Sequence, residues 1–295
     1  MAHETEQGPM TLSRRNVLEL SIGGAAAIVA GRQPAIAARR SLDEIRESAL
    51  DFFQGRGHVP VPSLAMITGY DFNGGLCFDD TRPETPPGPW MAFQTAARID
   101  DIAERNRPGV LAGFTIISVG RPRPADSSTP LDAILEFLVE VRGLRPERMA
   151  FVSTAVFKPL IERFEPLRAG RFIERDITEA KEAGDGSGYF APSGHPYGPS
   201  EYTVGIYYPL GDTVAAASTY PLDDYIEIAE IVAPPADSPR GPQQGGIGLE
   251  RLAMAEGKPI PDFEESRLDL LRMIEEEAER EGKPLPPGIT AFASL

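Results

Sequence analysis

The chain has 295 residues, of which 41% are hydrophobic and 25% charged, a composition that supports a sizeable buried core and excludes wholesale disorder. Its 44 acidic residues outnumber 29 basic ones, and the resulting formal net charge of −15 disfavours a general polynucleotide-binding surface. The single cysteine, Cys77, excludes an internal disulfide or a cysteine-built zinc site. With only three histidines, the usual histidine-rich metal site is excluded as well.

The first 40 residues differ in kind from the rest and predict a signal or disordered segment. Arg14 and Arg15 precede a weakly apolar, glycine-rich stretch, and Ala35-Ile36-Ala37 then offers a small-x-small site for a signal peptidase. The paired arginines resemble a twin-arginine export signal. The stretch is too short and too polar for a stable membrane anchor. An untidy tail or a misassigned start remains the alternative, with a cytoplasmic location.

The remaining elements follow in chain order. Ser41 and Glu44 form a capping box that starts a helix ending near Gly55, and the Gly-, Pro- and Asp-rich stretch 73–90 predicts a loop. Periodicity then predicts strands at 113–119 and 149–152, helices from 129 and over 155–164, a loop at 184–200, strands at 203–208, 213–218 and 224–232, a loop at 233–245, and helices from 248 and around 268–274. This order indicates an α+β fold with an antiparallel sheet flanked by helices.

Four stretches follow one another in an order that one enzyme family shares. They are residues 41–58, residues 87–102, the pair 198–201 with 225–232, and Gly246-Ile247-Gly248-Leu249-Glu250-Arg251. They resemble, respectively, the opening helix, the motif 2 strand of archaeal-type members, the amino-acid-binding strands and motif 3 of alanyl-type class II aminoacyl-tRNA synthetases. The resemblance implies a class II catalytic domain over 41–256, followed by an acidic C-terminal helix and tail at 257–295.

The resemblance also implies ATP and Mg²⁺ as cofactors and gives roles to five residues. Arg98 would hold the α-phosphate and the substrate carboxylate, while Arg251 would lie over the adenine and reach the γ-phosphate. Phe114 would stack on the adenine from the other side. Gly248 would let the nucleotide approach the backbone, and Glu227 would hold Mg²⁺ between phosphates. Guanidinium groups suit this chemistry, because attack of a carboxylate on the α-phosphate builds up negative charge.

Several positions depart from the family pattern. Thr115 stands where motif 2 has a glutamate, and Gln244 stands where an aspartate pairs with the ammonium group of alanine. Tyr189 replaces a tryptophan of the substrate site, and Ala229 and Glu230 replace an aromatic residue and an Asn or Thr. Tyr189 and Gln244 are therefore the expected substrate-binding residues, and the ATP half of the site is better preserved than the alanine half.

We expect an enzyme that activates a small carboxylic or amino acid as an adenylate and passes the acyl group to an acceptor such as a carrier protein or a small amine. Charging of tRNA is not expected, because only about forty, strongly acidic, residues follow motif 3. The alternative is a catalytically degenerate, exported synthetase-like binding or regulatory module. Thr115 and the scarcity of ATP outside the cytoplasm favour it. Motif 1 is not recognisable, so the oligomeric state stays open.

Overall fold

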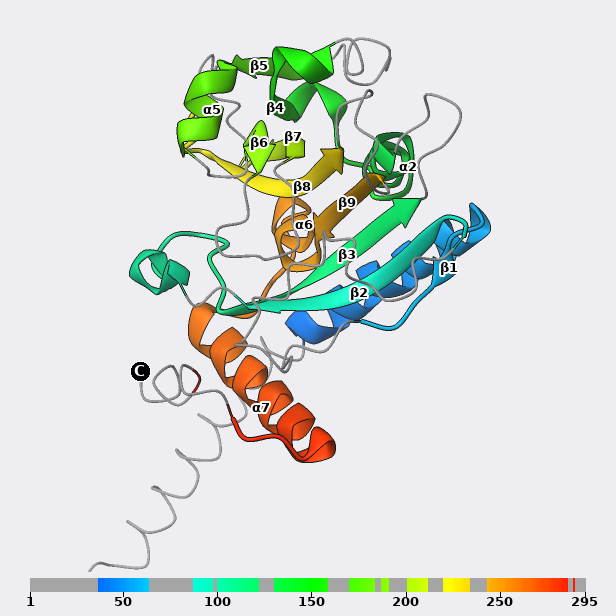
Figure 1. Cartoon of the computed structure of the whole chain (residues 1–295), viewed down its shortest axis with the longest axis vertical. Helices are drawn as coiled ribbons and strands as arrows, with labels where there is room; N and C mark the ends of the chain where they lie inside the picture. Colours follow the sequence, from blue (N-terminus) through cyan, green and yellow to red (C-terminus); the bar gives the residue numbers. More distant parts are fainter. Residues whose placement is uncertain are drawn as a thin grey trace, which may run out of the picture.

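The computed structural model of the chain describes residues 37–63, 87–97, 100–121, 130–158, 170–183, 187–190, 201–211, 220–233, 243–285 and 289. Within these residues, nine strands form one mixed sheet in the order β1-β2-β3-β9-β8-β7-β4-β5, and β6 pairs with β7 beside this path (Figure 1). Helices flank the sheet, so the α+β class predicted from the sequence is confirmed.

Most neighbouring strands are antiparallel, and only the pairs β1–β2 and β4–β5 among the described strands are parallel. The strands are β1 (Val59–Pro60), β2 (Trp90–Ala97), β3 (Gly113–Arg121), β4 (Ala150–Thr154), β5 (Arg171–Arg175), β6 (Tyr189–Phe190), β7 (Glu201–Pro209), β8 (Tyr225–Ala233) and β9 (Gln243–Gly248). A helix at 37–55 comes first, followed by the short helices η1 (Asp100–Glu104), α2 (Pro130–Glu136), η2 (Phe137–Val141), η3 (Pro146–Arg148) and η4 (Ala155–Phe157), and by α5 (Ile177–Ala183), α6 (Leu249–Ala255) and α7 (Phe263–Glu281).

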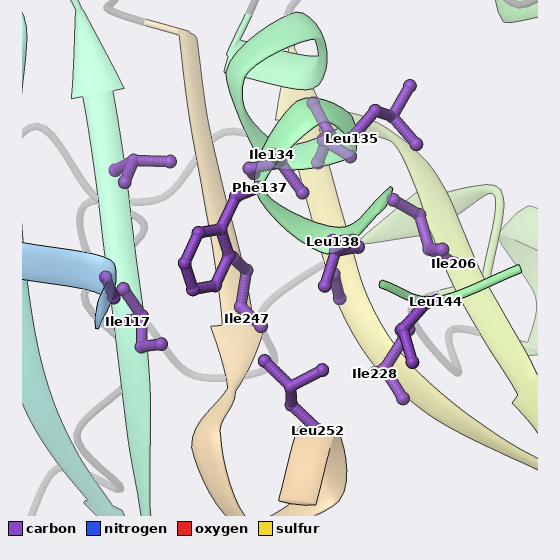
Figure 2. Packing of buried hydrophobic residues seen from close by; sticks show 14 of the residues in the cluster. Ile117, Ile134, Leu135, Phe137, Leu138, Leu144, Ile206, Ile228, Ile247 and Leu252 are labelled. Atoms are coloured by element: carbon purple, nitrogen blue, oxygen red, sulfur yellow. The ribbon is translucent and has the colours of Figure 1, made fainter. Parts of the chain in front are cut away.

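The main core lies on one face of the sheet, which we call the helix face. Ile117 of β3 and Ile247 of β9 lie directly opposite each other and point to this face. They pack with Phe137 and Leu138, which follow α2, and with Leu252 of α6 (Figure 2). The helix at 37–55 adds an apolar stripe to the same core, with Ile45, Ala49 and Phe53 fully buried. These alternating strand residues form the apolar side of the sheet, and the residues between them face its other side.

The helix α7 packs onto the edge of the sheet, and a capping box fixes its first turn. Leu270 and Ile274 of α7 pack against Ala97 and Ala112, at the ends of β2 and β3. The start of α7 is fixed by a capping box, in which the Asp262 carboxylate accepts the backbone N–H of Glu265 at 2.8 Å. The acidic C-terminal helix is therefore packed onto the sheet.

A buried ion pair fastens the segment after α2 to the end of α6. Arg142 Nε and Nη2 donate to the two carboxylate oxygens of Glu256, each at 2.7 Å, and both side chains are only 9% exposed. Such a two-pronged contact holds both partners in a fixed orientation, and removal of either leaves a buried charge.

The predicted strands at 113–119, 149–152, 203–208 and 224–232 are confirmed within a residue or two. The prediction that Ser41 caps the first helix is wrong, because the helix already covers residues 37–40 and Ser41 lies buried inside it. Ala38 is also buried, and this extra apolar position extends the helix toward the N-terminus. The boundary placed at residue 40 therefore falls inside the helix.

The predicted loop at 233–245 is wrong at its end, where β9 begins at Gln243. The predicted loop at 184–200 contains β6, and β5 and α5 were not predicted. The predicted strand at 213–218 lies outside the described residues, as does the signal-like segment before residue 37. Among the helices that the structure describes, none is long and apolar enough to cross a membrane.

Candidate functional site

Strand register defines a second face of the sheet, opposite the helix face, which we call the polar face. On β9, Gln244 lies opposite Gly120 of β3 and Val232 of β8. Gly246, two residues on, lies opposite Ser118 of β3 and Glu230 of β8. Residues directly opposite each other in neighbouring strands point to the same side, so Gln244, Ser118 and Glu230 share this face.

Gln244 is one of the predicted substrate-binding residues, and the structure places it on the polar face, near the start of β9. Its side chain is 5% exposed. The amide oxygen Oε1 is buried and accepts no hydrogen bond from any residue that the structure describes. A buried acceptor without a donor costs free energy, on the order of 1–3 kcal/mol, so this oxygen calls for a donor from outside the described chain.

A β-bulge brings two glutamates of β8 to the polar face. In a regular strand Glu227 and Glu230 would point to opposite sides, because side chains alternate. The pairing of β8 with β7 shifts between Ile206 and Tyr207: Ala229 lies opposite Ile206, and Glu227 lies opposite Tyr207. Ile228 is thus the extra residue of a bulge, which turns both carboxylates to one side.

Tyr207 of β7 lies close enough to both carboxylates for their charges to act on its phenol. Burial raises the pKa of its phenol, and the negative charges of Glu227, Tyr220 and Glu230 raise that pKa further. Its hydroxyl lies 2.6 Å from Ser187 Oγ. These residues border the polar face on the β7 side. No sequence pattern predicts them, because they come from three separate segments.

Glu227 and Arg251, which are 24 residues apart in the sequence, meet beside the start of α6. Arg251 Nη1 lies 3.6 Å from Glu227 Oε2 and donates to the Glu227 carbonyl oxygen at 3.4 Å. The two side chains are 26% and 27% exposed, so a ligand can reach both groups. The structure thus brings together the residues predicted to bind Mg²⁺ and the γ-phosphate.

The Gly109 loop also holds Arg251 in place. Arg251 Nε donates to the Gly109 carbonyl oxygen at 3.3 Å. Gly109 has a φ of 74°, and a Cβ at this position would collide with Ile226 Cδ1. Glycine is required here on both counts, and the close approach it allows sets the carbonyl against the guanidinium group.

Gly248 and Phe114 lie near this pair. Gly248 has a φ of −70°, and a Cβ there would meet Arg251 Cβ at 3.5 Å, an ordinary contact distance. Neither its conformation nor its packing therefore requires glycine. Phe114 lies on the polar-face side of β3, two residues before Ile116, which pairs with Gly248. Its half-buried ring is within the same region of the sheet.

One predicted site residue that the structure describes, Tyr189, is not brought to the polar face. Tyr189 of β6 lies opposite Tyr202 of β7, with ring centroids 5.6 Å apart, and Tyr202 packs against the core of the helix face. Tyr189 is thus on the other side of the sheet from Gln244, where Lys181 Nζ lies 5.1 Å from its ring. Arg98, which follows the last residue of β2, lies outside the described residues.

Glu250, in the first turn of α6, holds this helix against β3. Its carboxylate, 6% exposed, accepts the backbone N–H of Thr115 at 2.9 and 3.1 Å. Burial raises the pKa of Glu250 to about 7, and the Thr115 hydrogen bond and the charge of Arg46 oppose this rise. Because Glu250 immediately precedes Arg251, this contact fixes the position of the arginine relative to β3.

No protein-family model matches this sequence, and no curated protein matches it. The functional argument therefore rests on the residues of the polar face and on the groups that border it. Among the residues that the structure describes, no group of three or more His, Cys, Asp or Glu side chains could hold a metal ion. A protein-only metal centre is therefore not found in this part of the chain.

Proposed function

We propose that the chain is an ATP-dependent adenylating enzyme, with a core like that of alanyl-type class II synthetases. It activates a small carboxylic or amino acid and passes the acyl group to an acceptor other than tRNA, such as a carrier protein or a small amine. The observation that carries the proposal is the contact between Glu227 and Arg251 beside Gly248. The largely antiparallel sheet, with a parallel strand β1 at its edge, also supports it.

The glycine at position 248 supports a ligand at this place. Glycine in a strand costs stability, and the described neighbours leave room for a side chain. Gly248 is also the N-cap residue of α6, a position that accepts glycine, and it leaves the backbone there accessible to a group from outside the protein. The nucleotide is the ligand that we assign to this position.

ATP supplies the adenylyl group: a carboxylate oxygen of the substrate forms a bond to the α-phosphorus, and pyrophosphate leaves with the electron pair of the broken bond. Arg251 is already positioned by Gly109 and Glu227, so it offers a fixed positive charge to a phosphate at little cost of reorganisation. Glu227 fits a magnesium ion held mainly by phosphates, since such sites use only one or two protein carboxylates. Phe114 offers an aromatic surface to the adenine.

Calorimetric titration with ATP·Mg²⁺ tests the proposal. The wild-type protein should bind ATP·Mg²⁺, and Arg251→Ala should bind it roughly 10- to 100-fold more weakly, as expected for a charge-assisted hydrogen bond. Arg251→Lys should recover little, because lysine lacks the planar fork. Arg272→Ala, an exposed arginine of α7, is the matched control and should bind normally.

Pyrophosphate exchange across a panel of amino and carboxylic acids then tests the chemistry. Exchange with at least one acid is expected. Binding of ATP without exchange would favour the degenerate binding module, which retains the nucleotide site without the reaction. A wild-type protein that binds no ATP would overturn the proposal. For tRNA we expect only weak non-specific binding, on the order of 10⁻⁴–10⁻⁶ M, because of the net charge of −15.

We also propose that the N-terminal segment directs export. Replacement of Arg14 and Arg15 by lysine should retain the protein in the cytoplasm, because the twin-arginine pathway reads the arginine pair. Secreted protein should begin near Ala38, which is buried at the start of the first helix. Protein isolated from the native host with an intact Met1 would contradict export.

A further inference from the structure

The carboxylate of Glu227 and the ring of Tyr207 share one place on the polar face, over Gly205. Ile206 packs in the core of the helix face (Figure 2), so Gly205 and Tyr207, which flank it on β7, point to the polar face. A Cβ at Gly205 would lie 2.7 Å from Tyr207 Cε2 and 2.9 Å from Glu227 Oε1. Both distances are too short for a real Cβ, so the two side chains occupy the space that a larger residue would need.

Several contacts hold the Tyr207 ring over Gly205. Its hydroxyl lies 2.6 Å from Ser187 Oγ, which also donates to the Tyr220 hydroxyl at 3.2 Å. The Ser187 carbonyl oxygen accepts Arg175 Nη1 at 2.7 Å, and this contact ties the serine to the end of β5. The ring is 8% exposed and packs in the small apolar cluster at this end of the polar face. It therefore has a fixed position beside the carboxylate.

This arrangement sets the direction of the Glu227 side chain. Oε1 lies over Gly205 beside the ring, and Oε2 lies 3.6 Å from Arg251 Nη1. The two oxygens belong to one planar group, so a Cβ at Gly205 that displaces Oε1 also moves Oε2 away from the arginine. Residues that orient a metal-binding carboxylate commonly matter to metal affinity almost as much as the ligand itself.

We propose that Gly205 and Tyr207 are positioning residues, which hold the Glu227 carboxylate toward Arg251 and thereby toward the magnesium ion of bound ATP. The inference rests on the proposed function only for the magnesium ion. The orientation of the carboxylate is a property of the protein without nucleotide, and it can be measured separately.

Calorimetric titration with ATP, at a series of Mg²⁺ concentrations and in EDTA, separates the metal from the nucleotide. Mg²⁺ should strengthen ATP binding by wild type. Gly205→Ala should raise the Mg²⁺ concentration that gives half of this gain roughly 10-fold, as expected for the loss of a residue that orients a metal ligand. Glu227→Gln should raise it at least as much. Binding of ATP in EDTA should stay the same in Gly205→Ala, because Gly109 still holds Arg251.

Three further variants separate positioning from a folding defect. Gly245→Ala is the matched control: a Cβ there would lie 2.5 Å from Ile134 Cδ1 on the helix face, so it should lower stability without changing the Mg²⁺ requirement. Tyr207→Leu removes the ring and should raise the Mg²⁺ requirement as Gly205→Ala does, which keeps the test available if Gly205→Ala does not fold. Tyr207→Phe keeps the ring and should have a smaller effect than Tyr207→Leu.

A second measurement does not depend on the nucleotide. Urea denaturation of Glu227→Gln, Arg251→Ala and the double variant gives the coupling free energy between the two side chains. This coupling should be present in the wild-type background and lost in the Gly205→Ala and Tyr207→Leu backgrounds. If it is lost there while wild type binds no ATP, the positioning role stands and the adenylating function falls.

The opposite results overturn the positioning role and leave the adenylating function in place. They are a coupling that is absent from wild type or persists in both backgrounds, and a Mg²⁺ requirement that neither Gly205→Ala nor Tyr207→Leu changes.

Discussion

The buried carboxylate of Glu250 predicts an unusual dependence of stability on pH. Its pKa is raised from the ordinary value of 4.5 to about 7, chiefly by burial, so the folded protein binds the proton more tightly than the unfolded chain does. The stabilisation is therefore fully present below pH 4.5 and is lost as the pH rises through about 7. With about 1.4 kcal/mol for each pKa unit, the loss is on the order of 3 kcal/mol.

Glu250→Gln tests this directly, because glutamine keeps an oxygen for the Thr115 N–H and carries no charge. In urea denaturation, the free energy of unfolding of the variant should exceed that of wild type at pH 8 by about 1–3 kcal/mol. The difference should shrink toward zero at pH 5. The upper value is a limit, since the variant also loses the attraction between Glu250 and Arg46.

Glu264→Gln is the matched control, because the hydrogen bond from Arg267 lowers the pKa of Glu264. The stabilisation that Glu264 supplies is present above 4.5 and lost only at lower pH, so this variant should show a constant offset between pH 5 and pH 8. Parallel profiles of wild type and Glu250→Gln over this range would refute the reasoning. Loss of stability in Glu250→Gln at pH 8 would refute it as well.

Two further changes test the packing around the site. Gly109→Ala should lower the free energy of unfolding by about 2–4 kcal/mol, because φ is positive and the new Cβ collides with Ile226. Gly257 has a similar φ but open surroundings, so Gly257→Ala should lower this free energy by only about 1 kcal/mol. Arg142→Met should cost about 2–4 kcal/mol, because it leaves the buried Glu256 carboxylate with only the Lys258 ammonium group at 3.0 Å. Arg107→Ala, at an exposed pair, should cost less than about 1 kcal/mol. Urea denaturation measures both comparisons, and equal losses within either pair would contradict the corresponding argument.

Regular periodicity explains which parts of the fold were predictable. β3, β7 and β8 are buried runs of β-forming residues, and the sequence predicts them closely. The first turn of the helix at 37–55 was missed, because Ser41 and Glu44 form a capping pattern whose local signal is overridden by burial of Ala38. The start of β9 was missed because Gln243, Gln244 and the following glycines have low strand propensity. Pairing with both β3 and β8 keeps them in the sheet.

The site residues were less predictable from periodicity than the strands of the fold. The positions of Glu227, Gly248 and Arg251 came from the family resemblance, and the structure places all three together. Tyr189 could not be assigned to a side of the sheet, since that depends on its pairing with Tyr202. The side occupied by Glu230 depends on a bulge, and no residue pattern in β8 announces the extra residue.

That bulge changes how the departures from the family pattern are interpreted. In the sequence, Gln244 and Glu230 are separate substitutions, one that removes a carboxylate from β9 and one that adds a carboxylate on β8. In the sheet the two positions are diagonal neighbours on one face, so the carboxylate of Glu230 lies beside the position where the family pattern has an aspartate. Thr115 is different, because its backbone N–H, just past the end of β9, donates to Glu250 of α6 and lies away from both positions. The first two departures therefore belong to one place on the sheet, whereas the third lies at a separate place beside the start of α6.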